Sequence, residues 1–187
     1  SILIDEKTKV IIQGITGREA SIVAREMKEY GTKIVAGVTP GKGGKEVEGI
    51  PVYDTVKQAL TEHEANCALV YVPPLAAKDA AMEAMANGIP LVDVVTERVP
   101  VRDVAEMLAF ARKKNARVVG PTSVGIISPE KCKVGPIGGI NVERVYKKGS
   151  VGVISKSGGM STETSWVIRQ AGLGQSTVVG LGGDFLS

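Results

Sequence analysis

Short apolar runs alternate with helix-like segments over most of this 187-residue chain. This alternation is typical of a parallel sheet with helices on both faces, because parallel strands must be joined by crossover connections. The predicted strands lie at residues 10–12, 34–36, 50–52, 67–72, 89–95 and 117–119. The predicted helices between them lie at residues 19–30, 55–62, 76–86 and 101–115. Residues 1–124 are therefore predicted to form a Rossmann-like α/β domain with a parallel sheet.

The pattern changes after this first domain. Glycine and proline interrupt residues 125–149, which we predict to be a connector. Alternation then resumes with a predicted strand at 150–154, a helix at 160–171 and a strand at 176–181. These elements cannot cover both faces of a sheet, so residues 150–187 are predicted to be the first part of a second α/β domain. We expect the chain to be a fragment, or to need a partner that completes this domain.

Two helices carry further local signals. Asp54 precedes the predicted helix at 55–62 and is expected to be its N-cap, because a short side-chain acceptor satisfies a free N–H of the first turn. In the helix at 101–115, the spacing predicts one buried face with Val101, Val104, Leu108 and Ala111.

Two glycine turns follow the first two predicted strands, at residues 14–17 and 41–44. A glycine turn between a strand and a helix can hold phosphate, because the first helical N–H groups and the helix dipole point at the anion. An NAD site would need an acidic residue where the second strand ends. That strand instead ends at Thr39 and Pro40, and Lys42 follows. The lysine favours a phosphorylated ribose or a pyrophosphate over NAD; ordinary turns and a mobile surface loop remain the alternatives.

Composition excludes several other classes of function. The net charge of +3 is small and spread along the chain, which argues against nucleic-acid binding. The two cysteines lack metal or disulfide spacing, which indicates a reducing compartment and no metal site. No apolar run is long enough for a membrane span, so we expect a cytoplasmic or mitochondrial-matrix-type protein. The one histidine, His63, is flanked by acidic residues, and we expect it to lie on the surface without a catalytic role.

Several motifs resemble, in order along the whole chain, those of the α subunits of succinyl-CoA synthetases. They lie at Ser1–Asp5, Gln13–Gly17, Val38–Gly44, Tyr71–Pro73, Thr96–Glu97, Gly120–Pro121, Cys132–Gly135, Ser155–Gly158, Gly174–Thr177 and Gly180–Asp184. The resemblance implies a Rossmann-like CoA domain followed by a flavodoxin-like ligase domain, of which residues 150–187 are the first part.

The resemblance also implies an activity. Members of this family join a carboxylic acid, here most simply succinate, to CoA while cleaving a nucleoside triphosphate, through an acyl phosphate and a phosphohistidine. A β subunit supplies the site for ATP or GTP with Mg²⁺, in a heterodimer or heterotetramer. The phosphohistidine of the family lies beyond the end of this chain. The resemblance therefore implies no catalytic residue here, and we expect this chain alone to be inactive.

Site residues carried over from the family fall into two groups. Those expected to bind CoA are Thr16, Gly17, Arg18, Glu19, Lys42, Val95, Thr96 and Glu97. Those expected in the loops that hold substrate or phosphate are Thr122, Ser123, Ser157, Gly158 and Gly159.

Departures from the family pattern leave the acid open. The usual asparagine-cysteine pair is Thr122-Ser123 here, and the usual tyrosine of the second-domain turn is Thr162. The run at Ser157–Glu163 is closer to ATP-citrate lyase, so citrate or another dicarboxylate is the alternative acid. An NADP-dependent oxidoreductase, in which Lys42 holds the 2′-phosphate, and a non-catalytic CoA-binding module are the alternatives from other classes.

Overall fold

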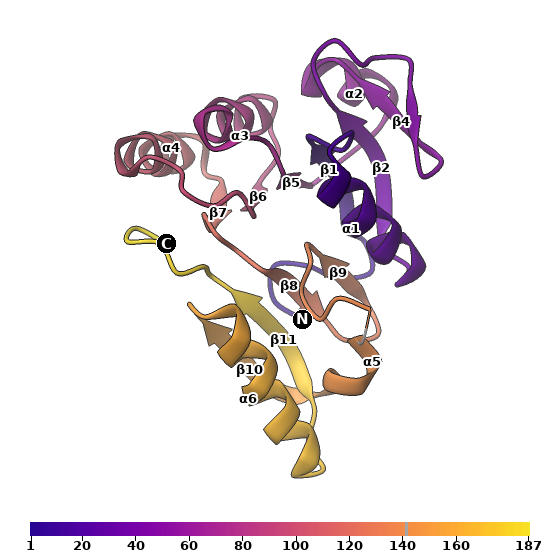
Figure 1. Ribbon diagram of the computed structural model, residues 1–187, viewed down its shortest axis with the longest axis vertical. Helices are drawn as coiled ribbons and strands as arrows, with labels where there is room; N and C mark the ends of the chain where they lie inside the picture. The colour runs from indigo at the N-terminus through magenta and orange to yellow at the C-terminus, as the bar shows by residue number, and fades with distance from the viewer. Residues whose placement is uncertain (141) are drawn as a thin grey trace.

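The computed structural model describes residues 1–140 and 142–187, which form two sheets (Figure 1). The strands of the first sheet are β1 (Lys9–Gln13), β2 (Lys33–Val38), β3 (Glu46–Val47), β4 (Ile50–Tyr53), β5 (Cys67–Val70), β6 (Leu91–Val94) and β7 (Arg117–Val119). Its helices are α1 (Arg18–Glu29), α2 (Val56–Glu62), the 3₁₀ helix η1 (Pro74–Ala76), α3 (Ala77–Ala86) and α4 (Val101–Lys114). The second sheet and its helices comprise β8 (Gly125–Ser128), β9 (Cys132–Val134), α5 (Val142–Val145), β10 (Lys148–Ser155), α6 (Gly158–Gln170) and β11 (Gln175–Gly180).

The first sheet has the strand order β3-β4-β2-β1-β5-β6-β7. Apart from the antiparallel pair β3–β4, its neighbouring strands are parallel. The chain builds outward from β1 through β2 to β4, and then returns to place β5 on the other side of β1. The direction of winding reverses between β1 and β5, and in such sheets ligands bind outside the carboxyl ends of the strands at this point. The predicted α/β class is confirmed.

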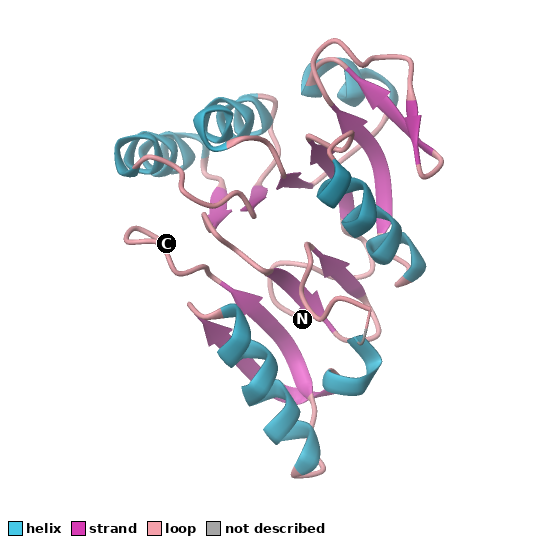
Figure 2. Ribbon diagram, viewed as in Figure 1, coloured by secondary structure: helices cyan, strands magenta, loops and turns pink. Residues whose placement is uncertain are grey.

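Apolar clusters lie on both faces of this sheet. One face packs against the buried sides of α2, α3 and α4, represented by Val56, Ala81 and Val104. The other face packs against α1, through Met27, and against residues of the second sheet such as Val134. Figure 2 shows the helices outside the strands in both parts of the molecule. One of the apolar clusters is therefore shared by the two sheets.

The second sheet has the order β10-β11-β8-β9 and includes residues that were expected to be a connector. Strands β8 and β9 form an antiparallel hairpin, and β8 also pairs antiparallel with β11, with Val178 opposite Ile127. Both strands are fully buried. The glycines and the proline at 129 hid these strands in the sequence, because the two apolar runs are short and a tight turn separates them. Residues 125–134 thus belong to a sheet.

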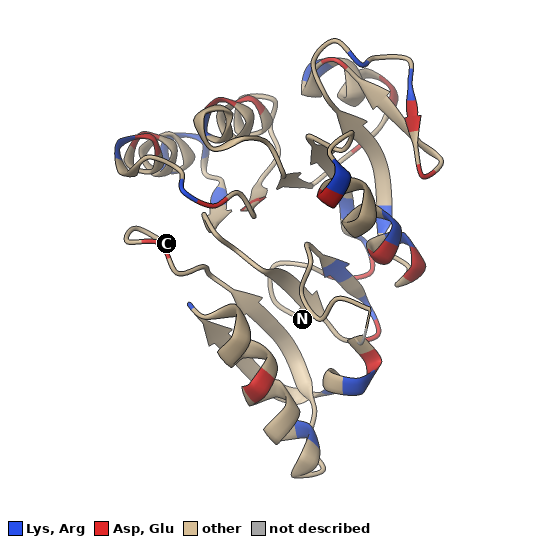
Figure 3. Cartoon of the chain, viewed as in Figure 1, with Lys and Arg blue, Asp and Glu red and all other residues tan. Residues whose placement is uncertain are grey.

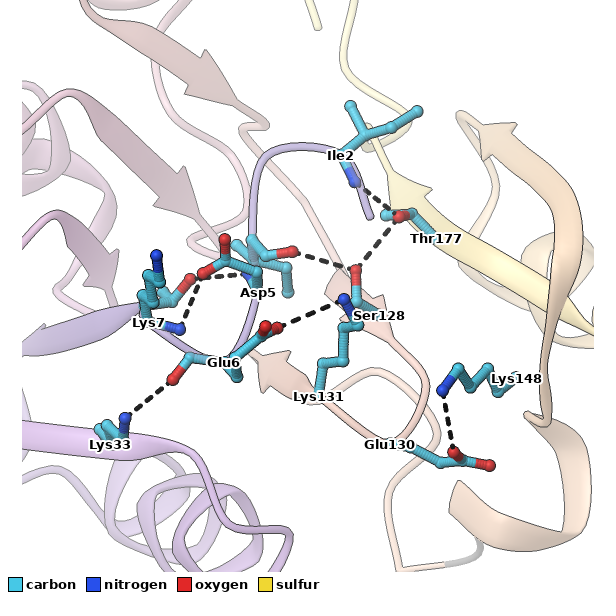
Figure 4. A network of polar contacts seen from close by, with 12 residues as sticks. Ile2, Asp5, Glu6, Lys7, Lys33, Ser128, Glu130, Lys131, Lys148 and Thr177 are labelled. Carbon is cyan, nitrogen blue, oxygen red and sulfur yellow. Dashed lines mark hydrogen bonds and ion pairs between the residues drawn. The ribbon is translucent and has the colours of Figure 1, made fainter.

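The N-terminal segment joins the two sheets (Figure 4). The N–H of Ile2 donates to Thr177 Oγ1 on β11 at 2.9 Å, and Ser128 Oγ donates to the carbonyl oxygen of Ile4 at 3.1 Å. The Lys33 ammonium on β2 donates to the carbonyl oxygen of Glu6 at 2.8 Å, while the Glu6 carboxylate pairs with Lys131 at 3.3 Å. This segment therefore holds the second sheet to the edge of the first.

Charged residues of both signs are interspersed along α1, α3 and α4 (Figure 3). None of the helices that the structure describes is long and apolar enough to span a bilayer.

Candidate functional site

A cleft of about 1100 Å³ lies between the carboxyl ends of the first sheet and the start of α6. Most of its lining comes from the start of α1, the loops after β5, β6 and β7, and the turn before α6, and Pro136 and Gly183 complete it. Of the predicted site residues it brings together Gly17, Arg18, Glu19, Val95, Thr96, Glu97, Thr122, Ser123, Ser157 and Gly158. Residues predicted to bind CoA and residues predicted to hold the substrate thus face one space.

The start of α1 opens into this cleft. Gly17 is the N-cap, and no side chain caps the first turn, so its N–H groups are free to bind an anion. At Gly14 the backbone has φ of 84°, and a Cβ atom there would lie 2.4 Å from the carbonyl oxygen of Tyr71. Only glycine allows this close approach of the first turn to the loop after β5.

A second cleft of about 630 Å³ lies on the other side of the Gly14–Gly17 turn. It is lined by Thr16 and by the end of β2 with Thr39 and Pro40, and on the α3 side by Ala80. The hydroxyl groups of Thr16 and Thr39 are 3.2 Å apart, which ties the first glycine turn to the loop after β2. The residues common to both clefts are Gly17, Tyr71, Val72 and Pro73. The two clefts therefore meet and form one elongated groove.

Two predicted site residues lie outside the walls of both clefts. Lys42 is exposed on the loop that follows Thr39 and Pro40, and its N–H donates to the Thr39 carbonyl oxygen at 3.1 Å. Gly159 is exposed in the first turn of α6. Lys42 thus follows the residues that line the second cleft, but it lies on an exposed surface loop.

The loop after β7 forms the inner wall of the first cleft. Thr122 has φ of 59°, a conformation that is strained for a β-branched residue, and its N–H donates to the carbonyl oxygen of Thr96 at 3.1 Å. Ser123 Oγ donates to the carbonyl oxygen of Gly180 at 2.8 Å and accepts from the N–H of Gly125 at 2.9 Å. These bonds fix the loop against both β6 and β11.

The turn before α6 forms the opposite wall. Ser157 caps α6 by accepting from the N–H of Met160 at 3.3 Å. A Cβ atom at Gly158 would lie 2.4 Å from Val124 Cγ1, so glycine is required where this helix approaches the loop after β7. Lys156 Nζ donates to the carbonyl oxygen of Asp184 at 3.0 Å.

Cations outnumber carboxylates along the first cleft. Arg18, Arg98 and Lys156 are exposed there, as are Glu19 and Glu97. Within the described residues, none of these five side chains forms an ion pair. Unpaired cations beside a free helix N-terminus suit an anionic ligand.

Beneath the inner wall lies Asp93 on β6, which is fully buried. Loss of hydration raises the pKa of this carboxyl to about 7, although the neighbouring Ser123 hydroxyl acts in the opposite direction. Burial also raises the pKa of Tyr71, to about 12, so its phenol is neutral in the wall of the groove.

His63 lies outside both clefts. It is half-buried at the end of α2, where its Nε2 atom is 2.9 Å from the hydroxyl of Tyr53, so it is less solvated than a free surface residue. Cys67 and Cys132 are buried thiols, and the described residues contain no cluster of three or more His, Cys, Asp or Glu side chains that could hold a metal ion.

Several lining residues were not predicted as site residues. Tyr71, Val72 and Pro73 line both clefts. Arg98 and Lys156 add positive charge to the first cleft. Their place directly after β5, β6 and β10 is a usable signal, because the carboxyl ends of parallel strands form the binding edge of such a sheet.

Comparisons with known proteins agree with this geometry. The family model described as CoA binding domain matches residues 5–98. The α subunit of ADP-forming succinate–CoA ligase from Aquifex aeolicus is 49% identical, over 98% of this chain and 60% of the relative. The corresponding α subunit 2 from Archaeoglobus fulgidus is 47% identical, over 98% and 63% respectively. ATP citrate lyase from Methanothrix soehngenii, in complex with citrate and coenzyme A, has a TM-score of 0.85 at 29% identity, over 98% of this chain and 32% of that one. The chain thus spans about 60% of the length of these curated relatives, and the resemblance seen in its motifs is confirmed.

Proposed function

We propose, from the premise that this chain belongs to the CoA-binding domain family, that its two connected clefts bind one molecule of coenzyme A end to end. CoA is long, with a phosphorylated adenosine at one end and a thiol at the other. The elongated groove through Gly17 and Tyr71 fits such a ligand better than either cleft alone would. This continuity is the observation that carries the proposal.

The chemistry of each part of the groove supports one orientation. The second cleft has apolar walls from Val38, Pro40 and Val72, which suit the flat adenine ring. The free N–H groups at the start of α1 suit the phosphates, and the exposed side chain of Lys42 adds a cation at the outer end. The thiol arm would then run through the first cleft toward Ser123 and Gly158.

We further propose that the chain is the CoA-binding part of the α subunit of a nucleoside-diphosphate-forming succinate–CoA ligase. Identities of 49% and 47% to ADP-forming α subunits support succinate as the acid and ATP as the nucleotide. The phosphohistidine would lie outside this chain, and a β subunit would supply the nucleotide site with Mg²⁺. Residues 1–124, 125–149 and 150–187 remain the proposed divisions into CoA domain, connector and first part of the ligase domain, although β8 pairs with β11 and β9 pairs with β8.

One observation favours a second acid. The ATP citrate lyase structure matches nearly the whole chain, and the turn at Ser157–Glu163 differs from the succinate pattern where it enters the first cleft. Comparing kcat/KM for succinate, malate and citrate in the complete enzyme with its β subunit decides between them. A preference for citrate would replace the ligase proposal by the lyase-type one and leave the CoA proposal intact.

Calorimetry with CoA, dephospho-CoA and NADP tests the CoA proposal. We expect CoA to bind more tightly than NADP, because residues 5–98 match the model of the CoA binding domain. Lys42→Ala should weaken CoA by roughly 1–3 kcal/mol, the range for a charge-assisted hydrogen bond. Lys45→Ala, in the same exposed loop, is the matched control. NADP binding as tight as that of CoA would refute the proposal.

A further inference from the structure

Asp93 is a buried acid without a partner at the junction of the two sheets. Its side chain has no solvent exposure, and neither carboxyl oxygen accepts a hydrogen bond from any described residue. A Cβ atom on Gly135, just after β9, would lie 3.3 Å from Asp93 Oδ2, so the second sheet's hairpin closes directly over the carboxyl group. A buried acid left unpaired in this way is costly when charged.

Ser123 lies near this carboxyl group, because its N–H donates to the carbonyl oxygen of Val94, the residue after Asp93 on β6, at 3.1 Å. A serine hydroxyl has one proton to donate, and Ser123 gives it to the carbonyl oxygen of Gly180 at 2.8 Å. Asp93 is therefore a second acceptor competing for the same proton. A charged carboxylate is the stronger acceptor of the two, whereas a neutral carboxylic acid is not.

The Ser123 bond holds the inner wall of the first cleft to β11. The backbone of the same loop is bonded to the first sheet, because the N–H groups of Ser123 and Thr122 donate to the carbonyl oxygens of Val94 and Thr96, each at 3.1 Å. Ser123 is thus the point at which the cleft wall, β6 and β11 meet.

We propose that Asp93 is a positioning residue of the CoA cleft that acts through Ser123. This inference rests on the proposed function. When Asp93 is neutral, Ser123 keeps its bond to Gly180 and the inner wall stays fixed to β11. When Asp93 releases its proton to solvent, the Ser123 hydroxyl turns to the carboxylate, Gly180 loses its partner, and the wall loosens.

The other titratable groups near Asp93 stay neutral. Cys67 on β5 and Tyr71 just after it both have raised pKa values because they are buried. The carboxylates of Glu19 and Glu26 on α1 influence Tyr71, and the two residues that approach Asp93 from the loops after β7 and β9, Ser123 and Gly135, do not titrate near neutrality. With a pKa of about 7, Asp93 is the group that changes charge near neutrality.

The test is the pH dependence of CoA affinity in four forms of the full chain. They are the wild type, Asp93→Asn, Ser123→Ala and the double variant. From pH 6 to pH 8 we expect the wild-type Kd to rise roughly 3- to 10-fold more than that of Asp93→Asn, the range for one hydrogen bond. The ionisation of CoA itself is common to all forms and cancels. In the Ser123→Ala background, Asp93→Asn should leave the profile unchanged.

An NMR titration of the wild type gives a second, ligand-free readout. The backbone amide signals of Gly180 and Leu181 should shift with the same midpoint as the Asp93 carboxyl carbon. Parallel pH profiles of wild type and Asp93→Asn, or Gly180 signals that do not follow Asp93, would overturn the inference while leaving CoA binding in place. If no form binds CoA at any pH, the proposed function fails, and the NMR titration still decides the role of Asp93.

Discussion

At the scale of single residues, Asp93 makes folding stability depend on pH in a direction unusual for an acid. Its pKa is raised from 3.8 to about 7 in the folded chain, so the folded state binds the proton more tightly. The contribution of Asp93 to the free energy of unfolding is greatest at low pH, falls as the pH rises from about 4 through about 7, and is constant above that. The free energy of unfolding of Asp93→Asn, relative to that of the wild type, should therefore increase by about 3 kcal/mol from pH 5 to pH 8. Urea unfolding at the two pH values measures this; an equal effect of the variant at both would contradict it.

Asp93 also shows why some of the site could not be predicted. An acidic residue inside an apolar strand run is visible in the sequence, but its isolation depends on Ser123 and Gly135, which only the fold brings over it. By contrast, Gly17 and Thr96 were predictable, since turns after parallel strands converge at one edge of the sheet. That Lys42 lies outside both clefts depends on a loop conformation that no local pattern specifies.

At the scale of elements, α2 begins with a capping box at Thr55, so the prediction of Asp54 as the N-cap was wrong by one residue. Thr55 Oγ1 accepts from the N–H of Gln58 at 3.1 Å, and Gln58 Oε1 accepts from the N–H of Thr55 at 3.2 Å. Asp54 instead accepts from the N–H of Gly43 at 2.9 Å. Thr55→Ala should cost about 1 kcal/mol of unfolding free energy, as for other N-caps. Denaturant unfolding checks this with Asp54→Ala as the control, and a larger loss for the control would restore Asp54 as the cap.

Helices with a strongly periodic apolar pattern were predicted well, but which of their residues are buried depends on the packing of neighbouring elements. The helix at Val101–Lys114 was expected, and Val104 and Ala111 of its predicted face are buried, but Val101 is 58% exposed and the buried Met107 was not predicted. The reason is that α3 and the sheet contact the side that carries Val104 and Met107, and a helical pattern with apolar residues on more than one side does not reveal which one is covered.

At the scale of the whole molecule, the shared apolar cluster predicts that both sheets unfold together. Met27 on α1, Leu91 on β6 and Val179 on β11 belong to one buried cluster. Trp166, the single tryptophan, lies on α6 over the second sheet, with the guanidinium of Arg144 5.5 Å from its ring centre. Its fluorescence and far-UV circular dichroism should therefore report the same transition in urea. Loss of the Trp166 signal at lower urea than the dichroism would show that the second sheet unfolds by itself.

The groove's shared wall has a consequence for inhibitor design. Since Gly17, Tyr71, Val72 and Pro73 line both clefts, two weakly binding fragments, one in each cleft, would lie next to each other along these residues. A short tether passing Gly17 would make the second binding event intramolecular, and its effective concentration would raise the affinity without any new contact. A long natural ligand already has this form, so the spacing between its two ends is a template for the tether.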